Sequence, residues 1–194
     1  MGISPKIKRY VVRILFLTFI ISVGLNLYDH FVTLPKMQAT TNNMRVHALW
    51  EWQSQMMTVK NMLKTAETNL DAYDAWIHAT LAIRFLQIYG IEIDRHNPDN
   101  LYYWLSLSTS RLDQACMDIY SGKDPGPTSE NIGEYVLQKI GNVTQAIENI
   151  MNSMKISANG VDPVQYLLEI GNLTNTMNYC NQLIETSTEI INYY

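Results

Sequence analysis

Residues 49–77, LWEWQSQMMTVKNMLKTAETNLDAYDAWI, decide the fold. Apolar side chains recur through this stretch at alternating spacings of three and four residues. They are Leu49, Trp52, Met56, Val59, Leu63, Ala66, Leu70, Tyr73 and Ile77. Such spacing is the a and d pattern of a helix that packs one face against other helices, sustained here for four heptads. Residues 44–89 therefore predict one long helix, which the unbroken phase favours, or two helices with Thr68 as the N-cap of the second.

Three more helices are predicted over residues 97–121, 128–158 and 162–194. Each starts at residue types that cap helices, and glycine- or proline-rich segments lie between them. The predicted inward stripes are Leu101, Leu105, Ser108, Leu112, Ala115 and Ile119, then Ile132, Val136, Ile140, Val143, Ile147, Ile150 and Met154, then Tyr166, Ile170, Leu173, Met177, Cys180, Ile184, Ser187 and Ile191. No segment has the alternation of a strand. The fold class is therefore all-α, an N-terminal transmembrane helix followed by an up-and-down antiparallel bundle of four or five helices over residues 44–194.

The start of the chain has the composition of a membrane anchor. Residues 1–9 are basic and contain no acid, and the fourteen residues after Arg13, ILFLTFIISVGLNL, carry no charge. A helix over residues 10–28 would be about 27 Å long, close to the thickness of the hydrocarbon core of a bilayer. Tyr10 and Tyr28 would lie at the two interfaces, and Arg13 could extend its guanidinium to the headgroups.

Charge asymmetry predicts the orientation of this helix. Four of the 14 basic residues lie within the first thirteen positions, and all 18 acidic residues follow the apolar segment. Since basic flanks stay in the cytoplasm, we expect a single-pass protein of the cell membrane with residues 1–9 inside and residues 29–194 outside. Residues 29–43 have no apolar period and contain Pro35, which predicts a juxtamembrane tether. The alternative is a signal peptide cleaved after Gly24.

Cys116 and Cys180 are the two cysteines of the chain. Outside the cytosol a cysteine pair tends to oxidise, and both residues would lie toward the same end of helices that run parallel. The sequence therefore predicts a disulfide, whose loop of about 65 residues would stabilise the fold by roughly 4 kcal/mol. Two buried free thiols are the alternative.

Two tripeptides, Asn142-Val143-Thr144 and Asn172-Leu173-Thr174, match the acceptor pattern for N-glycosylation. With 17 asparagines and 26 serines and threonines in the chain, chance alone supplies about two such matches. Each asparagine directly precedes a predicted inward residue, so both are expected on the outward side as candidate acceptors.

Aromatic residues off the predicted stripes suggest an interaction surface. Trp50 and Tyr103 could form a recognition patch or pack against neighbouring helices.

Motifs of known chemistries are absent from the sequence. It contains no Gly-x-Ser-x-Gly, glycine-rich phosphate loop, His-Glu-x-x-His or Glu-x-x-His. His47 and Glu51, like Asp74 and His78, are spaced as surface pairs on a helix, and the segment 92–96 is either a weak cation site or a solvated loop. We expect no enzyme activity, cofactor or metal, and the net charge of −4 argues against a nucleic-acid partner.

These patterns predict a membrane-anchored, extracytoplasmic helical bundle that acts as an interaction or scaffold module. Its partners would be the lipid bilayer, through the N-terminal helix, and a protein partner or a second copy, through the seam of residues 49–77 if that seam projects beyond the bundle. Two alternatives stay open: a ligand-sensing bundle that works with a separate signalling partner, and a secreted inhibitor released after Gly24.

Overall fold

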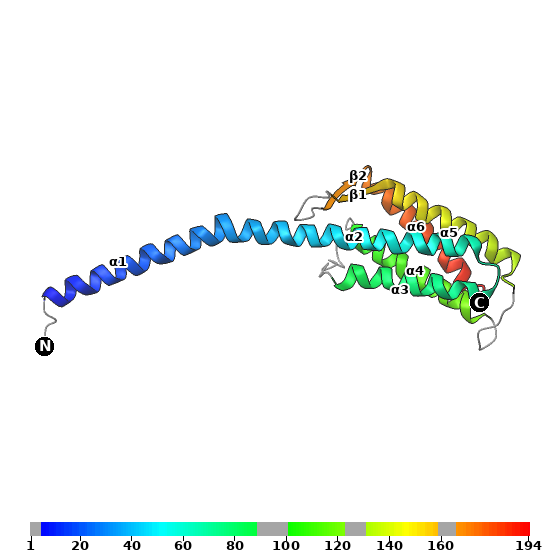
Figure 1. The fold of residues 1–194 in the computed structure, drawn as a ribbon, viewed down its shortest axis with the longest axis horizontal. Coiled ribbons are helices and arrows are strands. Elements are labelled where there is room, and N and C mark those ends of the chain that lie inside the picture. The colour runs from blue at the N-terminus through cyan, green and yellow to red at the C-terminus, as the bar shows by residue number, and fades with distance from the viewer. Residues whose placement is uncertain (1–4, 89–100, 123–130, 159–165) are drawn as a thin grey trace. The chain divides into compact units, whose positions relative to one another are not determined.

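A computed structural model of the chain describes residues 5–88, 101–122, 131–158 and 166–194. The chain forms two compact units, residues 1–42 and 43–194. The predicted all-α architecture is confirmed, with the addition of a small hairpin (Figure 1). The helices are α1 (Pro5–Tyr28), π-helix η1 (Asp29–Thr33), α2 (Leu34–Thr65), 3-10 helix η2 (Asn69–Asp71), α3 (Ala72–Ile88), α4 (Leu101–Ser121), α5 (Glu134–Ser153) and α6 (Leu173–Ile191), and the strands are β1 (Met154–Ala158) and β2 (Tyr166–Ile170).

The first unit contains the apolar helix that the sequence predicts. Its large side chains are exposed, Phe16 at 62%. In the part of the chain that is described, one helix is long and apolar enough to cross a membrane, by the criteria of length and composition that an N-terminal signal sequence also meets. Thr18 and Asn26 donate side-chain hydrogen bonds to carbonyls four residues earlier, both at 2.9 Å. These bonds lower the cost of placing polar groups in an apolar medium.

The predicted tether, residues 29–43, is helical in the structure. The π-helix η1 precedes Pro35, which lies in the first turn of α2. Proline lacks the N–H that a continuous α-helix needs, and a π-turn, here closed by the N–H of Leu34 on the carbonyl of Asp29, accommodates that loss. The π-turn keeps the segment helical, and hydrophobic periodicity does not predict such a local change of the backbone.

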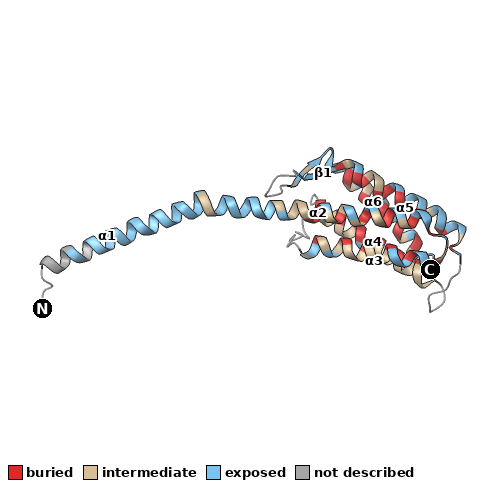
Figure 2. Ribbon diagram, in the orientation of Figure 1, coloured by how far each residue is buried: buried red, intermediate tan, exposed pale blue. Residues whose placement is uncertain are grey.

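The second unit packs helices α2 to α6 as an antiparallel bundle (Figure 1). Its core is continuous and runs through all five helices (Figure 2). Every residue of the stripes predicted for α4 and α5 is buried, from Leu101 to Ile119 and from Ile132 to Met154. These two stripes are confirmed because three- and four-residue spacing places one apolar face on the core.

The long-helix prediction for residues 44–89 is wrong, and the two-helix alternative is right. The helix stops at Thr65, and a capping box joins Thr68 and Asp71 before α3. Beyond the break the predicted stripe leaves the core, with Leu70 exposed at 52% and Tyr73 at 40%. A stripe of smaller residues replaces it on the inward face of α3. These residues are Ala72, Ala75, Ala79, Ala82 and Leu86.

Residues 154–158 and 166–170 form a pair of strands that the sequence interpretation missed. β1 pairs with β2 in antiparallel register, with Met154 opposite Ile170 and Ile156 opposite Leu168. Ile156 and Leu168 pack on the core. Tyr166 and Ile170, which the helical stripe includes, are four residues apart, and this spacing also places two residues on one face of a strand. The last helix therefore begins at Leu173, eleven residues later than the predicted start. The helix starts predicted at residues 97, 128–129 and 162 lie outside the described residues.

The inward face of α6 is also rotated from the prediction. Cys180 and Ser187 are buried as expected, but the other buried residues are neighbours of those predicted. They are Thr176, Leu183 and Ile190, whereas Leu173, Met177, Ile184 and Ile191 are at least partly exposed. Because the stripe was extrapolated from Tyr166 and Ile170, which lie in a strand, its phase was wrong.

Candidate functional site

A groove of about 450 Å³ runs between α2 and β1 in the second unit. Its lining residues are Trp50, Gln53, Ser54, Met57, Thr58 and Ile156. Trp50 and Met57 are each 41% exposed, and lie seven residues apart on one face of α2. Two large apolar side chains at the solvent surface, bordered by hydroxyl and amide groups, resemble the composition of a protein-recognition surface. We name these six residues the α2 groove.

The two candidate surface residues, Trp50 and Tyr103, lie on different helices, and only Trp50 lines the α2 groove. Trp50 lies in the α2 groove, with the ring of His47 6.2 Å from its own. Tyr103 lies on α4, half-buried, with its ring packed edge-on against Trp104 at 5.6 Å. Trp50 is therefore the better candidate for a binding residue.

The sequence interpretation missed an aromatic cluster on α3 and α4. Trp76 and Tyr120 stack with their ring centroids 6.1 Å apart and their planes inclined by 11°. Tyr73 contacts both rings, at 5.1 Å from Tyr120 and 5.9 Å from Trp76. The apolar spacing predicts Tyr73 in the core, but Tyr73 is 40% exposed and belongs to this cluster.

The predicted disulfide is wrong, because Cys116 and Cys180 are both free and buried. Cys180 of α6 lies close to the hydroxyl of Ser108 of α4, which acts on its thiol, and is therefore roughly level with that residue. Cys116 is eight residues further along α4, about 12 Å at 1.5 Å per residue. A disulfide requires Cα atoms within about 7 Å, so the two thiols lie at incompatible heights on neighbouring helices.

Both thiols are held in the protonated form. Burial raises the pKa of the Cys180 thiol to about 12, partly opposed by its hydrogen bond with Ser108. Burial also raises the pKa of the Cys116 thiol, and the nearby carboxylate of Asp113 adds to the effect. Because the thiolate is the reactive form, neither cysteine is suited to nucleophilic or metal chemistry.

The histidines take part in local contacts. Nε2 of His47 lies 3.7 Å from a carboxylate oxygen of Glu51, as the spacing predicts. His78 bonds instead to the amide oxygen of Gln55 on α2, with Nδ1 at 2.6 Å. Within the described ranges, no group of three His, Cys, Asp or Glu side chains could hold a metal ion. The candidate cation segment 92–96 lies outside those ranges.

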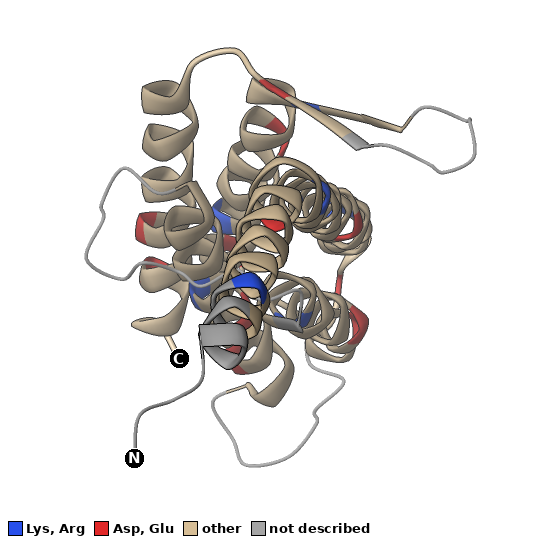
Figure 3. Ribbon diagram, turned by 90° about the vertical axis from the view of Figure 1, so that its left-hand side faces the viewer, with Lys and Arg blue, Asp and Glu red and all other residues tan. Residues whose placement is uncertain are grey.

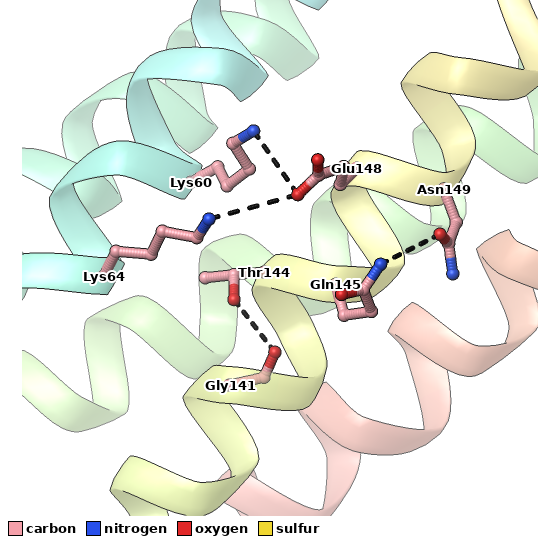
Figure 4. Close-up of polar contacts among 7 residues, drawn as sticks. All are labelled: Lys60, Lys64, Gly141, Thr144, Gln145, Glu148 and Asn149. Atoms are coloured by element: carbon pink, nitrogen blue, oxygen red, sulfur yellow. Dashed lines mark hydrogen bonds and ion pairs between the residues drawn. The ribbon is translucent and has the colours of Figure 1, made fainter.

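Acidic and basic residues both lie on the helices of the bundle (Figure 3). One cluster joins α2 to α5: Lys60 and Lys64 both approach the same oxygen of Glu148, at 3.7 and 4.0 Å (Figure 4). Lys60 is only 8% exposed. The pairing neutralises an ammonium group that the bundle largely removes from water.

The candidate span and glycosylation residues are all at the surface. Tyr10, Arg13 and Tyr28 are exposed on α1, and Asn142 and Asn172 are exposed in the second unit. Asn142 lies inside α5, whereas Asn172 is the N-cap of α6.

Comparison of the chain with models of protein families, with curated proteins and with solved structures finds no significant match.

Proposed function

We propose that this protein is a single-pass membrane protein whose second unit, residues 43–194, acts outside the cytoplasm as an interaction or scaffold module. The observation that carries the proposal is the apolar helix at the start of the chain, whose large side chains, as far as the structure describes them, are exposed. In water such a surface is unfavourable by about 25 cal/mol for each Å². A bilayer removes that cost.

The proposed orientation places residues 1–9 in the cytoplasm. The basic residues near the start of the chain support it through the positive-inside rule. The chain beyond residue 28 has 10 basic and 18 acidic residues, and an acidic module is repelled by anionic headgroups. It would therefore extend from the membrane surface toward a partner.

The mechanism we propose is tethering, which raises the effective concentration of the module for a protein partner in the same membrane or next to it. The α2 groove is the proposed contact surface, because it exposes Trp50 and Met57, two turns apart, on one helix face. The apolar seam from Leu49 to Ala66 is buried in the core of the bundle. It therefore does not serve for self-association.

Two measurements test this proposal. Reporter fusions at each end of the chain should report a cytoplasmic N-terminus and an external C-terminus, and alkaline extraction should leave the full-length chain in the membrane. A cytoplasmic C-terminus would exclude the proposed orientation.

For the contact surface, a photo-crosslinking amino acid at Met57 should yield one discrete adduct, while the same group at Leu137, also 41% exposed but on α5, should yield none. Equal adducts at both positions would exclude the α2 groove.

A further inference from the structure

The two candidate glycosylation sequences lie in opposite structural settings. Asn142 is exposed in the middle of α5, but its partner Thr144 is only 4% exposed. The hydroxyl of Thr144 donates to the carbonyl of Gly141 at 2.9 Å (Figure 4). A transferase must reach the asparagine and the hydroxyl together, which is typical of surface loops. In the folded helix, the acceptor sequence at Asn142 is therefore not accessible to the transferase.

Asn172 offers the geometry that Asn142 lacks. It lies between β2 and α6, exposed, with an extended backbone at φ −151° and ψ 110°, and Thr174 is exposed as well. Its Oδ1 accepts a hydrogen bond from the backbone N–H of Asn175 at 3.1 Å. An N-glycosidic bond is made at Nδ2 and leaves Oδ1 an amide oxygen. Capping of α6 and glycosylation are therefore compatible.

A hollow of about 310 Å³ lies directly beside Asn172, which forms part of its wall. Three further asparagines, Asn149, Asn152 and Asn175, line it together with Tyr179. Each amide both donates and accepts hydrogen bonds, which suits the hydroxyl and acetamido groups of a sugar. No carboxylate, ammonium or guanidinium group is among the lining residues described. The wall therefore favours a neutral ligand rich in hydroxyl groups.

We propose that Asn172 carries an N-linked glycan and that the first sugar residue of this glycan lies in the hollow. The inference rests on the proposed function, since a lipid-linked oligosaccharide donor would meet the chain outside the cytoplasm. In the transfer, Nδ2 of Asn172 forms a bond to the anomeric carbon of the donor as the bond from that carbon to the lipid diphosphate breaks. One Nδ2 proton passes to solvent and the lipid diphosphate leaves. A membrane transferase supplies the catalysis.

Mass spectrometry of peptides from the full-length protein, isolated from the membranes of its own source, tests the modification. We expect a saccharide mass on the peptide containing Asn172 and none on the peptide containing Asn142. Thr174→Ala should abolish the increment while keeping the helix cap, and Asn142→Asp should leave it unchanged. An unmodified Asn172, or equal modification of both asparagines, would overturn the proposal.

A second measurement tests the hollow. Enzymatic removal of the glycan should lower the unfolding temperature by a few degrees in the natural protein, because bound sugar stabilises the folded state. The same treatment should leave the Asn152→Ala/Asn175→Ala variant unchanged. An equal decrease in both proteins would overturn the placement of the sugar in the hollow.

Protease treatment of intact cells separates this inference from the proposed function. If the second unit is digested from outside and Asn172 is bare, the glycan proposal fails and the membrane module stands. If the unit is protected inside the cell, both proposals fail.

Discussion

The indole Nε1 of Trp52 on α2 donates a hydrogen bond to the hydroxyl of Thr109 on α4, 3.0 Å away, and both side chains are fully buried. The same hydroxyl donates to the carbonyl of Leu105 at 2.6 Å. Thr109 therefore satisfies an indole N–H that the core would otherwise leave without a partner. This bond fixes the relative height of two helices that are separated by α3 in the sequence.

Replacement of Thr109 by valine keeps the shape of the side chain and removes its oxygen. We expect Thr109→Val to lower the free energy of unfolding by about 1–3 kcal/mol, since the buried indole N–H loses its acceptor. Thr109→Ser, which keeps the hydroxyl and loses one methyl group, serves as the matched variant and should cost less. Urea denaturation followed by Trp fluorescence measures both changes. A Val variant as stable as the natural protein would show that the hydrogen bond contributes nothing net.

The carboxylate of Asp71 closes the turn between α2 and α3. It accepts hydrogen bonds from the backbone N–H groups of Glu67 and Thr68, at 3.0 and 2.7 Å, and from the Thr68 hydroxyl at 2.9 Å. These bonds, the backbone bond from Thr68 first among them, lower the pKa of Asp71 below its usual value of 3.8. Because the folded-state pKa is depressed, the stabilisation is fully present above the unfolded value and is lost as pH falls through the folded value.

Asp71→Ala should therefore lower the unfolding temperature at neutral pH, and the difference from the natural protein should shrink as pH falls below 4. Thermal denaturation followed by circular dichroism between pH 3 and 7 measures this dependence. Asp74→Ala, at an exposed position in the first turn of α3, is the control for loss of a carboxylate near a helix start. A pH-independent difference at Asp71 would contradict the proposed cap.

The parts of the fold that periodicity predicts are those in which one apolar face is continuous from cap to cap. The stripes of α4 and α5 meet that condition, and every predicted residue is buried. Between α2 and α3 the condition fails, because Leu70 and Tyr73 continue the apolar phase while a parallel stripe from Ala72 to Ala82 competes with it. Alanine is weakly apolar, and the alanine face of α3 is the buried one because it packs closely against α4.

Two other features depend on distances that sequence spacing does not contain. The paired strands were missed because Tyr166 and Ile170, four residues apart, fit the period of a helix as well as that of a strand. The disulfide was wrong because the helix assignments placed both cysteines toward one end of the bundle but did not give their relative heights. Of the residues that line the α2 groove, the sequence predicts a surface role for Trp50 alone. Ile156 lines the groove because it lies in β1, a strand that the sequence does not predict.

The state of the two thiols gives a direct test of the helix heights. Cys116 and Cys180 are free and buried, so a thiol reagent should label neither in the folded protein at pH 7. After denaturation without reductant, both should be labelled. A protein that carries a disulfide would remain unlabelled under the same conditions until reductant is added. Mass spectrometry of the labelled chain distinguishes the outcomes, and two labels are expected only after unfolding.

The cluster of Lys60, Lys64 and Glu148 gives the last prediction. Glu148 is 40% exposed, but the side chain of Lys60 is only 11% exposed, so removal of the carboxylate leaves an ammonium group largely shielded from water. We expect Glu148→Ala to lower the free energy of unfolding by about 1–2 kcal/mol, less than for a fully buried pair because solvent screens the carboxylate. Lys64→Ala should cost less than about 1 kcal/mol, since its side chain is 52% exposed.

Lys60→Met separates pairing from packing in the same cluster. Methionine keeps most of the apolar stem of lysine and removes the charge, so the variant should be as stable as the natural protein or slightly more stable. In the Lys60→Met background, Glu148→Ala should lose most of its effect, because no shielded ammonium group remains to be stranded. Urea denaturation of the four proteins in this double-mutant cycle gives the coupling energy. A coupling energy of zero would show that Lys60 is neutralised by solvent and not by Glu148.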